Sequence, residues 1–119
     1  MRVMGNIYNS TKNNTIASDV KIAKTFFTRS FGLLSRKSIS DNEGLIIKPC
    51  NSIHTFFMKF PIDVLFVDRK NKIVAVYENV SKNRILPIHL NSNYVLELAS
   101  GQISNKNIEK YDIIQINEQ

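Results

Sequence analysis

The amino-acid sequence predicts an α+β fold: one compact, barrel-like domain of mostly antiparallel β-strands, with one main helix near residues 26–35. Three observations support this prediction. The chain has 119 residues, which suits a single domain with one core. Short apolar stretches separated by polar turns fill the second half of the chain. One segment of the first half instead shows helical spacing of its apolar residues. We therefore treat residues 1–119 as one domain.

The first half of the chain predicts two strands followed by the helix. The predicted strands cover residues 3–8 and 15–23, and the second shows a loose alternation of apolar and polar residues. Thr25 is a suitable N-cap for a helix over residues 26–35. One face of this helix is mostly apolar, because spacings of three, four and seven connect Phe26, Phe27, Ser30, Leu33 and Leu34.

The second half predicts β-strands. In chain order, the predicted strands are residues 44–48, 52–59, 62–68, 72–78, 94–99 and 111–116. The polar turn at residues 69–71 predicts that 62–68 and 72–78 pair as an antiparallel hairpin. Gly101 marks a turn, and residues 108–110 predict a single helical turn.

The net charge of the chain is positive but dispersed. There are 16 Lys and Arg against 10 Asp and Glu, a balance of +6, and a basic surface attracts nucleic acid or anionic lipid. No window holds five like charges in a row, so we expect no nucleic-acid partner. The apolar runs are far shorter than the ~20 residues that span a bilayer, so we expect no membrane insertion. A single Cys and the absence of a secretory segment at the start favour the cytoplasm.

Four ordered motifs resemble those of the DUF192 family, also called UPF0127. They are Arg29-Ser-Phe-Gly-Leu-Leu-Ser-Arg36, Glu43-Gly-Leu-Ile-Ile47, the stretch from Cys50 to Asp68, and Val95-Leu-Glu-Leu-Ala-Ser-Gly101. The central motif is the most specific, with His-Thr-x-x-Met followed by Ile-Asp-x-x-Phe-x-Asp. The chain departs from the family pattern at Leu34, where Met is common, and at Tyr111-Asp112, where Gly-Asp is common. The resemblance implies a compact β-rich domain, and it implies no particular reaction.

Cys50, His54 and Met58 carry the soft ligand types that bind copper(I). In a strand, however, four residues span about 13 Å, whereas the ligands of one ion lie within about 4 Å of one another. A regular strand therefore cannot gather all three side chains. We predict that the protein has no metal site and no cofactor. On this interpretation Cys50 and Met58 are core side chains, and His54 is a hydrogen-bonded structural histidine.

Asp63 and Glu97 are the most informative polar residues, because each lies inside an otherwise apolar predicted strand. Burying a lone carboxylate costs several kcal/mol, so each must be exposed, paired or hydrogen-bonded. One interpretation is structural, with two satisfied carboxylates that hold the sheet in place. The other is functional, with Arg29, His54, Asp63 and Glu97 converging on a small ligand in a polar cleft.

Two functions remain open at this point. The first is a non-catalytic binding or accessory module whose partner is an unknown small ligand or protein. The alternative is a small hydrolase-type enzyme that uses His54 with Asp63 or Glu97 as general acid and base. An enzyme needs these groups in one concave site with perturbed pKa values, whereas a structural role buries each carboxylate separately against backbone groups.

Overall fold

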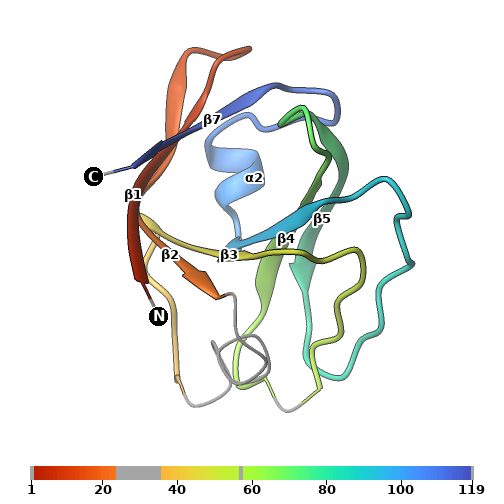
Figure 1. Ribbon diagram of the computed structural model, residues 1–119. Coiled ribbons are helices and arrows are strands. Elements are labelled where there is room, and N and C mark those ends of the chain that lie inside the picture. Colours follow the sequence, from red (N-terminus) through yellow and green to blue (C-terminus); the bar gives the residue numbers. More distant parts are fainter. Residues whose placement is uncertain (1, 24–35, 57, 119) are drawn as a thin grey trace.

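The computed structural model describes residues 2–23, 36–56 and 58–118 (Figure 1). Its strands are β1 (Arg2–Asn9), β2 (Asn14–Ala23), β3 (Glu43–Ile47), β4 (Ile62–Val67), β5 (Ile73–Val80), β6 (Tyr94–Ala99) and β7 (Ile114–Glu118). A short helix, α2 (Gln102–Asn105), follows β6. The helix predicted near residues 26–35 lies outside the described residues.

The strands form a single curled sheet in the order β5-β4-β6-β3-β2-β1-β7. Every neighbouring pair is antiparallel except β2 and β3, which are parallel. The sheet wraps around α2 as a half-barrel (Figure 1). Its two edge strands approach each other at one end, where Ile73 N donates to Asp112 O and Ile114 N donates to Asn71 O, each at 2.9 Å. The predicted single, mostly antiparallel, barrel-like domain is therefore confirmed.

The central strands bury side chains on both faces of the sheet. All residues of β4 and β6 are buried. We call the face that packs on α2 the inner face; its core includes Leu65, Leu96 and Ile103. The opposite face is the outer face; its core includes Val64 and Val95. Because successive side chains alternate between faces, adjacent residues of β4 and β6 belong to different cores.

The predicted hairpin over residues 62–78 is confirmed. β4 and β5 pair antiparallel with Leu65 opposite Val76. Asp68 shapes the connecting turn, because its Oδ1 accepts the backbone N–H groups of Lys70 at 2.8 Å and Lys72 at 2.9 Å.

The predicted strand over residues 52–59 is wrong. The described residues of this segment form no strand, and His54 makes one isolated bridge with Ile85. Thr55 instead ties the segment to the β5–β6 connection: its Oγ1 donates to Ser81 O at 2.6 Å and accepts from Arg84 N at 2.9 Å. Among the described residues of this segment, the single bridge to Ile85 is the only strand-like pairing, so the β-preference of its aromatic and β-branched residues does not produce a strand.

Two predictions near the C-terminal end also need correction. Residues 108–110 are not helical, and the helical segment is Gln102–Asn105 instead. The last strand begins at Ile114 rather than at residue 111, because Tyr111 has a left-handed φ of 77° that interrupts an extended chain. No helix in the described part of the chain is long and apolar enough to cross a membrane.

Candidate functional site

Asp63 on β4 is fully buried, and three backbone amides donate to its carboxylate. Asn79 N donates to Oδ1 at 2.8 Å, while Gly101 N at 3.1 Å and Ile103 N at 2.8 Å donate to Oδ2. Gly101 has a φ of 97°, which suits glycine and turns the chain into α2. Asp63 therefore joins β5 and the start of α2 to β4, which supports its structural interpretation.

Glu97 on β6 differs from Asp63 because its neighbours across the sheet are apolar. The residue is 7% exposed, and these cross-strand neighbours are Leu45 on β3 and Val64 on β4. Within the described part of the chain, no residue forms a hydrogen bond or ion pair with its carboxyl group. Burial raises the pKa of Glu97 to about 7. The carboxyl group therefore changes its charge near neutral pH.

The sheet places Asp63 and Glu97 on opposite faces. Val64 pairs with Glu97 and belongs to the outer core, so Asp63, its neighbour in β4, points to the inner face. The side chains of Asp63 and Glu97 therefore project from opposite sides of the sheet.

His54 is exposed, and its ring lies 5.1 Å from that of Phe56. No hydrogen bond or ion pair joins His54, Asp63 and Glu97 to one another. Arg29 lies outside the described residues. The convergence of these four residues on one ligand thus stays a prediction, and Glu97 is the member that the described structure leaves without a partner.

A second carboxyl group near Glu97 is already paired. Glu43 begins β3 and shares the outer face with Leu45, the neighbour of Glu97. Arg36 donates to it twice, from Nη1 to Oε2 at 2.8 Å and from Nη2 to Oε1 at 2.9 Å. These bonds from Arg36 lower the pKa of Glu43 to about 2, against the opposing effect of burial. Glu43 is therefore a paired carboxylate at neutral pH, unlike Glu97.

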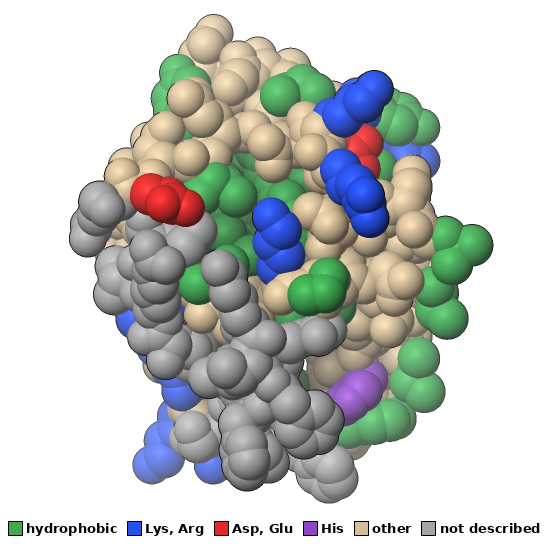
Figure 2. Space-filling view, in the orientation of Figure 1, with side chains coloured by type: hydrophobic (Ala, Val, Ile, Leu, Met, Phe, Trp, Pro, Cys, Tyr) green, Lys and Arg blue, Asp and Glu red, His purple; other side chains and the backbone are tan. Residues whose placement is uncertain are grey.

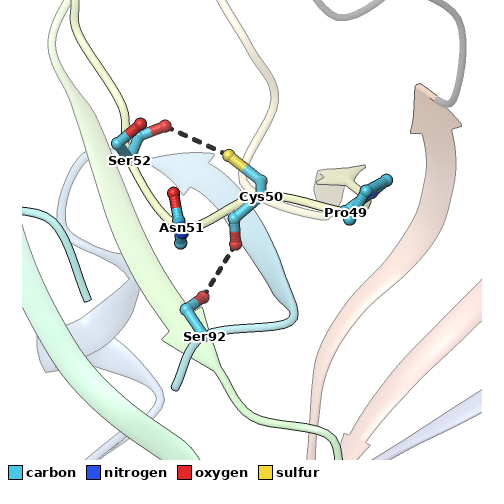
Figure 3. Close-up of a pocket in the computed structure, with 5 residues that line it drawn as sticks. All are labelled: Pro49, Cys50, Asn51, Ser52 and Ser92. Atoms are coloured by element: carbon cyan, nitrogen blue, oxygen red, sulfur yellow. Dashed lines mark hydrogen bonds between the residues drawn. The ribbon is translucent and has the colours of Figure 1, made fainter. Parts of the chain in front are cut away.

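A separate pocket of about 310 Å³ lies beside the loop after β3 (Figure 3). Its lining residues are Pro49, Cys50, Asn51, Ser52 and Ser92. Cys50 Sγ donates to Ser52 O at 3.1 Å, and Ser92 Oγ donates to Cys50 O at 2.9 Å. The described lining residues include no acid–base pair, and none of the four residues predicted for the cleft is among them.

The sequence analysis did not identify His89, which the fold places in an aromatic cluster. Its Nε2 lies 2.7 Å from Tyr77 Oη, and its ring lies 4.5 Å from that of Phe66. No local pattern in the loop sequence signals these contacts, because Phe66 and Tyr77 belong to two earlier strands, β4 and β5.

The three soft ligand residues of the central motif, Cys50, His54 and Met58, differ in their exposure to solvent. Cys50 and Met58 are buried, while His54 is exposed. Among the described residues, no group of three His, Cys, Asp or Glu side chains is arranged to hold a metal ion.

We predict that protein purified without added metal contains no stoichiometric zinc or copper, which elemental analysis can measure. Cys50→Ser and His54→Ala should leave the metal content unchanged. One equivalent of metal that is lost in His54→Ala would contradict the prediction.

The fold and the site define a small β-rich half-barrel in which the carboxyl group of Glu97, a buried residue on the outer face, has no partner among the residues that the structure describes. Residues 7–116 match the model of the DUF192 family, described as "Uncharacterized ACR". The chain belongs to the DUF192 family.

Two relatives that this chain matches over more than two thirds of their length support the assignment. UPF0127 protein TK1120 of Thermococcus kodakarensis is 32% identical over 114 residues, which cover 91% of this chain and 71% of that protein. UPF0127 protein PH1112 of Pyrococcus horikoshii is 33% identical over 101 residues, covering 80% of this chain and 84% of that protein.

Two crystal structures share the fold. A protein of unknown function from Novosphingobium aromaticivorans has a TM-score of 0.83 at 20% identity, covering 95% of this chain and 84% of that one. A "putative transcription regulator" from Sinorhizobium meliloti has a TM-score of 0.80 at 19% identity, covering 98% and 94%. At these identities the likeness concerns the fold alone.

Proposed function

We propose that this DUF192 protein is a non-catalytic binding module that binds, at Glu97, a small organic cation with an apolar body. One observation carries the proposal: Glu97 is a residue that is only 7% exposed, and its carboxyl group has no hydrogen-bond or ion-pair partner among the described residues. Buried polar groups normally have partners, and those without one are candidates for binding or catalysis. A bound ligand would supply the missing partner.

The surroundings of Glu97 favour a particular ligand chemistry. Its neighbours across the sheet, Leu45 and Val64, are apolar and offer no charge to balance a carboxylate. A ligand with a positively charged head supplies that charge, and an apolar body suits the aliphatic surroundings. A primary alkylammonium ion has both properties. Because it binds the ionised carboxylate, its affinity should fall as the pH drops below the pKa of about 7.

The hydrolase-type alternative has less support. A pKa near 7 suits a general acid or base, but such a group needs a partner within hydrogen-bond reach of the reacting atoms. Both oxygens of Asp63 accept backbone amides on the inner face. His54 is exposed, with its ring beside Phe56. Neither residue forms a hydrogen bond or ion pair with Glu97. Glu97 therefore has neither predicted catalytic partner within hydrogen-bond reach, and a carboxyl group acting alone is better suited to binding than to acid–base catalysis.

The test is a titration of the protein with n-butylammonium, followed by amide chemical shifts. We expect saturable shifts in residues around β6, with about tenfold tighter binding at about pH 8 than at about pH 6. n-Butanol, which has the same chain length and no charge, should bind more weakly and without pH dependence.

Two variants make the experiment specific. Glu97→Gln keeps the shape of the side chain and removes its charge, so it should abolish the preference for n-butylammonium. Glu78→Gln makes the same change at an exposed position and should bind as the natural protein does. Equal binding of n-butylammonium and n-butanol, or unchanged binding in Glu97→Gln, would refute the proposal.

A further inference from the structure

The β5–β6 connection, residues 81–93, presents three large aliphatic side chains to solvent. Ile85 is 71% exposed, Ile88 is 65% exposed and Leu90 is 87% exposed. In Figure 1 this cyan connection runs along one edge of the molecule, and Figure 2 shows hydrophobic side chains standing out along the same edge. Such a row of exposed aliphatic residues is typical of an interaction surface.

Hydrogen bonds hold the backbone of this connection in place. Leu86 N donates to Ile53 O at 3.0 Å, and His89 N donates to Asn51 O at 2.9 Å. Leu86 itself is 4% exposed and packs in the outer core. Burial of Leu86 and the two backbone bonds fix the conformation in which its neighbours project outward. The apolar surface is therefore a preorganised part of the fold, which lowers the entropic cost of binding.

The charges carried by the two segments that meet at this surface have one sign. The two segments that form it, residues 48–60 and 81–93, contain no Asp or Glu. Their cationic residues are all exposed and are Lys48, Lys59, Lys82 and Arg84. Such a surface is complementary to an anionic partner that also accepts aliphatic side chains.

We propose that this face docks on an anionic lipid surface, where Ile85, Ile88 and Leu90 enter the headgroup region and Lys82 and Arg84 contact lipid phosphates. A lipid surface is favoured over a protein because an anionic leaflet offers phosphates to the cations and an apolar layer to three projecting side chains that are each at least 65% exposed, and it needs no matching hollows. Headgroups adapt to such projections, and each cation near an anionic leaflet adds roughly fivefold to the affinity. This docking requires no membrane-spanning segment and is independent of the ligand proposed at Glu97.

The experiment uses Leu90→Trp, because the chain contains no Trp and the emission then reports on this site alone. The probes are phosphatidylcholine vesicles with and without about three parts in ten of phosphatidylglycerol. We expect a blue shift with the anionic vesicles and at least about tenfold weaker binding to the neutral ones. Raising the salt from about 0.05 M to about 0.5 M should weaken the binding, because salt screens the exposed charges.

Sedimentation with the anionic vesicles tests the surface without the Trp reporter. Ile88→Ser with Leu90→Ser should reduce binding about tenfold or more, and Lys82→Ser with Arg84→Ser should reduce it in a salt-dependent manner. Tyr111→Asn is the control, since it removes another exposed hydrophobic side chain, 64% exposed, elsewhere on the chain.

Three results would overturn the proposal. They are an unchanged Trp emission with both kinds of vesicle, equal binding to both kinds, and the same loss in Tyr111→Asn as in the loop variant. A blue shift with an acidic, aliphatic peptide but with neither vesicle would show that the face binds protein, and the lipid proposal would then be wrong.

Discussion

Asp63→Leu should lower the free energy of unfolding by about 3–5 kcal/mol, the largest effect that we expect from a single substitution. The carboxylate accepts three backbone N–H groups, from Asn79, Gly101 and Ile103. Leucine offers no acceptor, so these donors would be left buried without partners or would have to reorganise. Hydrogen bonds to a charged group contribute about 1.5–3 kcal/mol each, and their contributions are not fully additive. Denaturant unfolding measures the change.

Two further variants test whether the loss of stability comes from the missing hydrogen bonds or from the introduction of leucine. Asp63→Asn retains one acceptor oxygen and should lose about half as much stability as Asp63→Leu. Asp41→Leu makes the same change at an exposed position and should be within about 0.5 kcal/mol of the natural protein. A neutral or stabilising Asp63→Leu would mean that the three bonds contribute no net stability. The place of Asp63 in the central motif would then point to function.

Glu97→Gln should remove a pH dependence from the stability of the fold. The pKa of Glu97 is raised by burial from 4.5 to about 7. Between these two values the folded protein keeps the proton and the unfolded chain has released it. The stability of the natural protein should therefore fall as the pH rises from about 4.5 to about 7, by about 1.4 kcal/mol per pH unit and about 3 kcal/mol in all.

Denaturant unfolding of both proteins across this pH range measures the effect. Glutamine does not titrate, so the difference between the two proteins should grow in favour of Glu97→Gln up to about pH 7 and then stay constant. Glu43→Gln is the contrasting control. The pKa of Glu43 is lowered by its bonds from Arg36, so its stabilising effect is present above pH 4.5 and is lost as the pH falls toward about 2. Parallel curves for Glu97→Gln and the natural protein would contradict the raised pKa.

The strands that could be predicted are those with strong local patterns. Residues 62–78 form the expected hairpin because a buried apolar strand, the Asp68 turn and a second apolar strand are adjacent in the chain. Segment 52–59 has equally suitable residue types, but the described fold offers it one isolated bridge to Ile85 in place of a strand partner. Strand formation depends on pairing with another segment, and local composition does not determine that pairing.

The position of α2 illustrates the same limit. Its four residues have no distinctive local pattern, and its start is held by Asp63, about forty residues earlier in the chain. Residues 108–110, which the local sequence favoured, are not helical. A single helical turn is too short to be stable through propensity alone, so tertiary contacts decide where it forms.

Sequence patterns alone were enough to predict the class of fold and the family, and they singled out Asp63 and Glu97 as candidates, because a charged residue inside an apolar strand can be recognised from residue order. Only the tertiary structure decided that Asp63 is satisfied by three amides while Glu97 on the opposite face has no partner in the described part of the chain. It also decided that Ile85, Ile88 and Leu90 are exposed while Leu86 is buried. The physical reason is that burial and hydrogen-bond satisfaction depend on which distant segments meet, and the curled sheet brings those segments together.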